Sequence, residues 1–285
     1  MKYILQNQKL HLEADTSGAE LTRIWGVENG REYLFDADPA YWKRHAPVLF
    51  PIVGSLKDKK LVIEGKDYPM GQHGFARDWE FVLTEQTENS LWFALEADDE
   101  SRKAYPYDFR LEIGYVLEDQ TIRVIWKVTN TGEKDLHYQI GGHPAFLCPE
   151  GAGLRFDSEQ PIVYRLLNGN GLVMDQTYEL TTEKGYYKIP KDMFDKDALI
   201  IEGSQSKKVS LCEPDGTPYL SVGFDAPLYG LWSPAGKNAP FVCIEPWFGR
   251  ADAASFEGGI EEREYDQMLA PGKAKEYAFT IEIEK

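Results

Sequence analysis

Hydrophobic and polar residues alternate along several stretches of this chain, and this alternation restricts its fold more than any other feature. Every second residue is apolar in residues 109–117, and the same spacing recurs in residues 122–128 and 277–283. Successive side chains of a β-strand point to opposite faces of a sheet, so a period of two predicts strands with one buried face. Shorter stretches at residues 10–14 and 91–95 continue the pattern. We therefore expect a protein built from antiparallel strands.

Turn sequences separate the alternating stretches, and helical sequences are rare. Turn signals lie at residues 118–120, 130–133, 213–216 and 270–272. A helix of one or two turns is predicted from Asp38, an N-cap residue followed by Pro39, and a second short helix from residues 190–194. Many short strands at regular spacing are typical of a sandwich or barrel and not of a βαβ fold.

No linker, low-complexity tract or strong internal repeat divides the sequence. All-β sandwiches of about 200–250 residues commonly form one unit. With 42% hydrophobic and 13% aromatic residues the chain can bury a large core, which excludes a disordered protein. We predict one all-β domain over residues 1–285, a large antiparallel β-sandwich with few short helices.

The chain is strongly acidic, with a formal net charge of −16 at pH 7. Nucleic acids and anionic membranes attract basic patches, so neither is an expected partner. No window approaches the roughly 18 apolar residues of a membrane span, and the N-terminus lacks the apolar stretch of a signal peptide. The three cysteines, Cys148, Cys212 and Cys243, lie far apart without CxxC spacing, which argues against a disulfide framework or a zinc ribbon. These features predict a soluble cytoplasmic protein that handles a small ligand, and they leave both a monomer and a homodimer open.

His73 is the first histidine whose surroundings suggest a ligand site. It lies between Gly71 and Gly74, so the backbone leaves room for close approach. Gln72 and Arg77 add a neutral amide and a forked cation within the same turn. The residues alone leave open a structural turn whose arginine pairs with a surface acid, but this crowding favours binding.

His143 lies in a similar frame. Gly141 and Gly142 precede it, and Pro144 follows it. A residue before proline is held in an extended conformation, which restricts the direction of the imidazole. A histidine that merely ends a strand remains an alternative at this point.

Glu245 follows an apolar run, residues 240–244, and precedes Pro246 and Trp247. Glutamate is almost never fully buried without a partner, so an acid beside a buried strand needs a reason. We expect Glu245 to end the strand before a turn over residues 246–249, and to be ionised and hydrogen-bonded in a partly enclosed cleft. Trp247 is suited to stacking against the apolar face of a sugar ring. The alternative is a surface glutamate at a strand end.

One carboxylate and two imidazoles beside an aromatic side chain form a general acid–base site without a nucleophile. HxH and HExxH spacings are absent, so no metal site is predicted. GxSxG, P-loop and GxGxxG patterns are also absent, which leaves no sign of a hydrolase, a nucleotide site or a cofactor. An ordinary glycosidase needs a second carboxylate, and no acid stands at a position comparable to Glu245, which lowers that option without removing it.

The three candidate segments belong to an ordered series of motifs that resembles the aldose 1-epimerase (galactose mutarotase-like) family, in particular its LacX-type branch from bacterial sugar operons. Each motif alone is weak, but the ordered set is specific and runs over nearly the whole chain. The motifs are Gly18-Ala19-Glu20-Leu21, residues 46–54, residues 72–77, Tyr105-Pro106-Tyr107, residues 142–146 and Glu245-Pro246-Trp247.

The resemblance implies a galactose mutarotase-type β-sandwich with its site in a cleft on one concave sheet. It implies Glu245 as the base that takes the proton of the C1 hydroxyl and His143 as the acid that protonates the ring oxygen. His73 would help to bind the sugar, and Asp197 falls where the family has an acid that orients sugar hydroxyls. The implied reaction interconverts α and β anomers of a hexose or related sugar and needs no cofactor.

The chain departs from typical galactose mutarotases before the first histidine, where residues 50–54 replace an Asn-Arg pair. Its cation follows the histidine instead, at Arg77, as in relatives similar to the hexose-6-phosphate mutarotases. A phosphorylated hexose is therefore an alternative substrate, although no second arginine is found at a matching position near Arg77 and phosphate usually gathers more than one cation. Further alternatives are a non-catalytic carbohydrate-binding or sensor protein, with Gln72, Arg77 and Trp247 as contacts, and a lyase or glycoside-processing enzyme.

Overall fold

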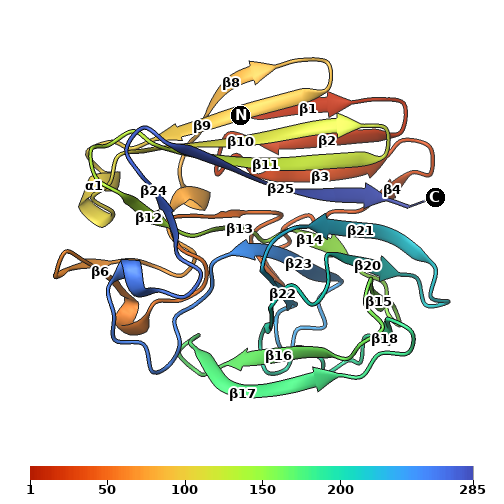
Figure 1. Ribbon diagram of the computed structural model, residues 1–285. Coiled ribbons are helices and arrows are strands. Elements are labelled where there is room, and N and C mark those ends of the chain that lie inside the picture. The colour runs from red at the N-terminus through yellow and green to blue at the C-terminus, as the bar shows by residue number, and fades with distance from the viewer. Residues whose placement is uncertain (285) are drawn as a thin grey trace.

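The computed structural model describes residues 1–284. Strands make up 49% of the structure and helices 5%, arranged in several antiparallel sheets. The predicted all-β class with few short helices is therefore confirmed. Figure 1 shows two main layers, with long strands above and a second sheet below them.

The upper layer in Figure 1 is part of a nine-stranded sheet that contains the three most regular stretches of the sequence. Its order is β18 (Tyr186–Lys188), β15 (Gly153–Phe156), β20 (Lys208–Cys212), β21 (Pro218–Phe224), β25 (Ala274–Ile283), β11 (Thr121–Asn130), β10 (Phe109–Glu118), β9 (Ser90–Glu96) and β8 (Val82–Gln86). Along β10 the odd-numbered residues are all buried, as the alternation predicts.

The lower layer is an eight-stranded sheet, and it carries the site described below. Seven strands follow in the order β17 (Val173–Leu180), β16 (Ile162–Leu167), β19 (Leu199–Glu202), β22 (Leu228–Trp232), β23 (Phe241–Phe248), β13 (Ile140–Gly142) and β5 (Val48–Leu49), and β14 (Ala145–Leu147) also pairs with β23. The two layers meet closely, because a Cβ atom on Gly142 of β13 would come within 2.9 Å of the Trp126 ring on β11.

Smaller elements complete the structure. They are the sheet β1 (Lys2–Gln6), β2 (Leu10–Asp15), β3 (Leu21–Gly26) and β4 (Arg31–Glu32), the pairs β12 (Leu136–Tyr138) with β24 (Gln267–Leu269) and β6 (Lys60–Ile63) with β7 (Lys66–Pro69), and the short helices η1 (Lys57–Lys59), η2 (Ala76–Asp78), α1 (Ser101–Ala104) and η3 (Ile260–Glu262). None of the helices within residues 1–284 is both long and apolar enough to cross a membrane.

Of the two short helices predicted from local signals, the one at Asp38 is limited to a single turn, and no helix is present at residues 190–194. At Asp38 the chain makes a single turn, in which the Asp38 carbonyl accepts the N–H groups of Tyr41 and Trp42, each at 3.0 Å. Residues 190–194 likewise form turns. The first turn of a helix fixes several dihedral angles for one hydrogen bond, so a good N-cap alone does not make a helix when no further turn follows.

Candidate active site

A cavity of about 200 Å³ lies against the face of the eight-stranded sheet that carries Glu245 and Trp247. On β23 the alternate residues Val242 and Ile244 point the other way, into the main core. Residues from eight separate stretches of the chain line this cavity, and the seven site residues predicted from the sequence are all among them: Gln72, His73, Arg77, His143, Asp197, Glu245 and Trp247.

Glu245 lies inside β23 and not at its end. The strand continues through Pro246 to Phe248, so the turn expected after Glu245 is wrong. β13 pairs with Trp247 and Phe248, and β14 pairs with residues 241–243. Residues 244–246 therefore have no partner in these two strands. A proline lacks an N–H group, and this break in the ladder lets Pro246 lie within a central strand.

His143 occupies that break. It falls between the end of β13 and the start of β14, where its backbone N–H donates to the Pro47 carbonyl at 3.1 Å. From there its Nε2 lies 3.2 Å from Oε2 of Glu245. The interruption in strand pairing thus brings the imidazole within proton-transfer distance of the carboxyl group.

The carboxyl group of Glu245 differs from the expected hydrogen-bonded, ionised state. The residue is 1% exposed, and apart from the 3.2 Å contact of Oε2 with Nε2 of His143 neither carboxyl oxygen has a hydrogen-bond partner among residues 1–284. Burial raises the pKa of Glu245 well above its usual value, and the negative charge of Asp197 acts in the same direction. The protein environment therefore favours the protonated form.

Burial acts on His143 in the complementary direction. It lowers the pKa of His143 to about 3, and the charge of Arg77 adds to this effect. Because the two groups are close, they titrate as a pair whose shared proton can lie on either group. That proton is favoured on Glu245, and its transfer across 3.2 Å produces an imidazolium beside a carboxylate.

His73 is held as a neutral hydrogen-bond donor. Its ring Nδ1 accepts the backbone N–H of Gly54 at 3.0 Å, and the backbone N–H of His73 donates to the Gly54 carbonyl at 2.9 Å. The ring proton is consequently on Nε2. Burial first, and then the charge of His143, lower the pKa of His73 well below its usual value, which keeps the ring uncharged.

Three tryptophans surround the acid–base pair. Trp42 stacks on His143 with ring centroids 4.7 Å apart, and Trp232 meets His143 edge-on at 5.3 Å. Trp232 Nε1 also donates to Oδ1 of Asp197 at 2.9 Å, which orients that carboxylate at the cavity. Trp247 is only 4% exposed. The sequence did not single out Trp42 or Trp232 for the site, because no spacing links either to His143.

Glycines on the neighbouring strands make room for Trp247. A Cβ atom on Gly141 or Gly230 would come within 2.6 or 2.4 Å of the indole. Trp247 therefore lies flat against β13 and β22, and it forms a wall of the cavity instead of projecting into it.

Two arginines, Arg77 and Arg44, lie close together near the cavity, whereas the sequence analysis singled out Arg77 alone. Arg77 donates from Nη2 to the Gln72 carbonyl at 2.7 Å, and its buried Nε has no hydrogen-bond partner among residues 1–284. Arg44 contacts Asp78 at 2.7 Å, and Arg77 lies 3.9 Å from the same carboxylate. Burial, followed by the positive charge of Arg44, lowers the pKa of Arg77 to about 10. The expectation that Arg77 has no second arginine nearby is wrong, because Arg44 comes from a distant loop.

Cys243 lies next to the pair. It is two residues before Glu245 on the same face of β23 and is fully buried. Burial, and then the charge of Glu245, raise the pKa of its thiol well above the usual value. One ligand atom from each of His143, Cys243 and Glu245 lies within 4.8 Å of the other two.

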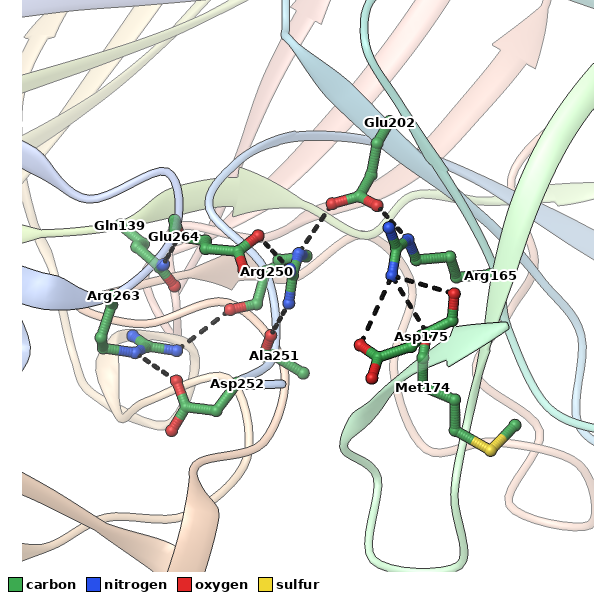
Figure 2. Close-up of polar contacts among 10 residues, drawn as sticks. All are labelled: Gln139, Arg165, Met174, Asp175, Glu202, Arg250, Ala251, Asp252, Arg263 and Glu264. Carbon is green, nitrogen blue, oxygen red and sulfur yellow. Dashed lines mark hydrogen bonds and ion pairs between the residues drawn. The ribbon is translucent and has the colours of Figure 1, made fainter. Parts of the chain in front are cut away.

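Ion pairs gather around the buried guanidinium groups of Arg250 and Arg263 (Figure 2), next to Ala251, which lines the cavity. Arg250, 3% exposed, contacts Glu202 at 2.8 Å and also Glu264, while Arg263 contacts Asp252 at 2.7 Å. Arg263 further donates to the Arg250 carbonyl at 3.0 Å. These contacts fix the loop after β23.

Asp252 connects this network to His73. Its backbone N–H donates to the Ser55 carbonyl at 3.0 Å, and its Oδ2 accepts the Lys57 N–H at 2.9 Å. These bonds hold residues 55–57, which directly follow Gly54, the residue that bonds His73. Gly54 has a φ of +73° and would bring a Cβ within 2.6 Å of Ala251, so no other residue fits there without strain.

Asp252→Asn is expected to lower the free energy of unfolding by about 3–5 kcal/mol, because it leaves the Arg263 guanidinium buried without its counter-ion. Urea unfolding measures the change. The matched control is Glu264→Gln, since the Glu264 side chain is 59% exposed, and its loss is expected to be about 1 kcal/mol or less. Equal losses in the two variants would contradict the role given to the Asp252–Arg263 pair.

The chain and its fold are similar to those of known proteins. The family model described as aldose 1-epimerase matches residues 1–277. The chromosomal protein LacX of Lactococcus lactis subsp. lactis is 32% identical over 296 residues, with 98% of each chain covered. A galactose mutarotase related enzyme from Lactobacillus acidophilus superposes with a TM-score of 0.93 at 32% identity, covering 100% of this chain and 98% of the other. A galactose mutarotase-like protein from Lactobacillus casei gives 0.93 at 27% identity, with 100% of both chains covered.

Proposed function

This chain belongs to the aldose 1-epimerase family, and on that premise we propose that it interconverts the α and β anomers of a hexose or related sugar by acid–base ring opening. The observation that carries the proposal is the His143–Glu245 contact of 3.2 Å in a cavity lined by a second, neutral histidine. A reversible proton shuttle needs one group that gives a proton and one that takes it, and this pair holds one proton between them.

In the proposed reaction, Glu245 acts as base and His143 as acid. The carboxylate of the imidazolium–carboxylate form takes the proton of the C1 hydroxyl, and His143 protonates the ring oxygen as the bond from C1 to that oxygen breaks. The aldehyde turns about C1–C2, and reclosure with the roles reversed gives the other anomer. One proton is given and one is taken in each direction, so the pair returns to its starting state.

The other polar groups would hold the sugar. His73 presents its Nε2 proton as a neutral donor that can polarise the ring oxygen. Asp197 and Gln72 line the cavity and supply groups that can orient sugar hydroxyls. Trp42 and Trp232 limit the space around His143. This scheme uses only side chains of the protein and needs no cofactor.

Anomerisation assays test the proposal directly. Polarimetry or NMR would follow freshly dissolved α-anomers of glucose, galactose and their 6-phosphates with and without catalytic amounts of protein. Acceleration with at least one sugar is expected. Spontaneous rates with all four, together with calorimetric binding of a sugar, would instead favour the non-catalytic carbohydrate-binding or sensor protein.

A phosphorylated hexose is a second candidate substrate, and the pairing of Arg44 with Arg77 favours it. Two guanidinium groups face the carboxylate that they share, Asp78. The unpartnered Nε of Arg77 is a further donor available to an anion. Phosphate recognition usually gathers more than one cation, which Arg44 and Arg77 together provide.

Arg77→Gln is expected to raise KM for the preferred hexose 6-phosphate by about 10–100-fold, the equivalent of one lost charged hydrogen bond. KM for the unphosphorylated sugar should change much less. Arg44→Gln serves as a comparison, because Arg44 lacks the contact with Gln72 that Arg77 makes, and it should show the same selectivity. Equal increases in KM for both sugars would exclude a phosphate-binding role.

A further inference from the structure

His143, Cys243 and Glu245 form a cluster of three side chains that can each bind a metal ion, and the acid–base scheme uses two of them. The three residues are 7%, 0% and 1% exposed, and their ligand atoms lie within 4.8 Å of one another. Cys243 takes no part in the proposed proton transfers. Its position is nevertheless fixed beside them, because β14 pairs Ala145 with Cys243 just after the break that holds His143.

An imidazole nitrogen, a thiolate and a carboxylate are the three protein ligands that zinc takes, and a catalytic-type zinc site adds water or substrate in the fourth position. Metal–ligand bonds of about 2.0–2.3 Å place ligand atoms roughly 3–4 Å apart, so only small side-chain movements would complete the geometry. The cavity on which His143 and Glu245 open offers the fourth position. Three protein donors and one open position thus match this class of site.

The unpartnered carboxyl group of Glu245 points independently to a ligand. Buried polar atoms in proteins are nearly always hydrogen-bonded, yet Oε1 of Glu245 has no partner among residues 1–284, and Oε2 has only the 3.2 Å contact with Nε2 of His143. A bound cation would satisfy at least one of them. This observation does not depend on the presence of Cys243.

The donor set also matches the charge of the ion. One thiolate and one carboxylate together carry two negative charges, which balance the two positive charges of Zn²⁺ in a buried site where net charge is costly.

We propose that His143, Cys243 and Glu245 form a binding site for Zn²⁺ or a similar thiolate-binding divalent cation, and that the bound ion inhibits the protein by withdrawing His143 and Glu245 from proton transfer. The inhibition rests on the proposed function, whereas the binding does not. The expectation of no metal site came from local spacing alone, and these three ligands are brought together by strand pairing.

Co²⁺ is the probe for binding. Added to the chelator-treated full-length protein, it is expected to bind one equivalent, to give a sulfur-to-cobalt charge-transfer absorption, and to be displaced by Zn²⁺. Absence of that band on saturation with Co²⁺, or no binding at micromolar concentrations, would overturn the proposed site. This measurement requires no activity, so it separates failure of the site from failure of the proposed function.

Cys243→Ala tests the ligand assignment, with Cys212→Ala as control because Cys212 is also buried but lies on β20 of the other sheet. Loss of an outer-shell partner costs about 10–100-fold in metal affinity, so loss of a direct ligand is expected to cost about 100-fold or more. Each variant's kcat/KM with Zn²⁺ is compared with its own value in chelator. Inhibition that persists unchanged in Cys243→Ala contradicts the proposal, and if this variant fails to fold, the Co²⁺ spectrum of the wild type decides.

Discussion

Glu245→Gln is expected to lower kcat for anomer interconversion by about 10²–10⁴-fold, the range that a positioned general acid or base contributes. Glutamine keeps the size and shape of the side chain but can neither take nor give the proton that it shares with His143. The substitution should affect kcat far more than KM, because the lost proton transfer occurs only as the ring opens. Polarimetric progress curves on the preferred sugar measure the change.

The free energy of unfolding of Glu245→Gln is the control for its loss of activity. Burial already favours the neutral form of Glu245, so a neutral amide removes no buried ion pair that the fold depends on. Urea unfolding of Glu245→Gln should therefore match or exceed wild type. A variant that is stable and as fast as wild type would refute the role of Glu245, whereas an unstable one would show that the side chain is structural.

His143→Gln is expected to reduce kcat by a similar factor, about 10²–10⁴-fold, because the amide cannot carry a proton to the ring oxygen. Since His143 and Glu245 share one proton across 3.2 Å, they act as a unit. The double variant should thus lose little more than the worse single variant. NMR measurement of anomer interconversion gives the rates of the two single variants and of the double variant.

His11→Gln is the matched control for this substitution. His11 lies on β2 and is not among the residues that line the cavity, and its ring contacts Gln6 and Glu13. Its activity should equal that of wild type. Strictly additive losses in the His143→Gln, Glu245→Gln double variant would show that the two residues act in separate steps.

Much of the fold followed from local pattern. β10, β11 and β25 are ten-residue strands, and the predicted alternation lies within them because one face of each packs into the core. β23 was harder, because its residues are buried on both faces and Pro246 resembles a terminator. The break between β13 and β14 that accommodates this proline depends on a partner strand about a hundred residues away, which no local signal reports. The short helices were misplaced because a cap is a local feature and a helix needs further turns.

The site shows the same division. His73, His143 and Glu245 could be chosen from residue type, glycine framing and family motifs, and all three line one cavity. Arg44 and Trp42 could not, because each joins the site through a contact between segments far apart in the chain. Cys243 is two residues from Glu245 on β23, but its closeness to His143 follows from the pairing of β14 with that strand. The role of Gly54 also required the structure, because its backbone N–H bonds His73, which lies 19 residues further along the chain.

The sequence alone determined which chemical groups the protein has available and the period that makes it a β-sandwich. Only the tertiary structure decided their state. Burial and neighbouring charges place the shared proton on Glu245 and keep both imidazoles neutral, and these effects depend on distances of a few ångströms in a medium that screens charge poorly. Desolvation and electrostatic interaction are properties of the packed molecule and not of any single residue. The protonation of the His143–Glu245 pair and the positions of Arg44 and Cys243 around it could therefore be learned only from the fold.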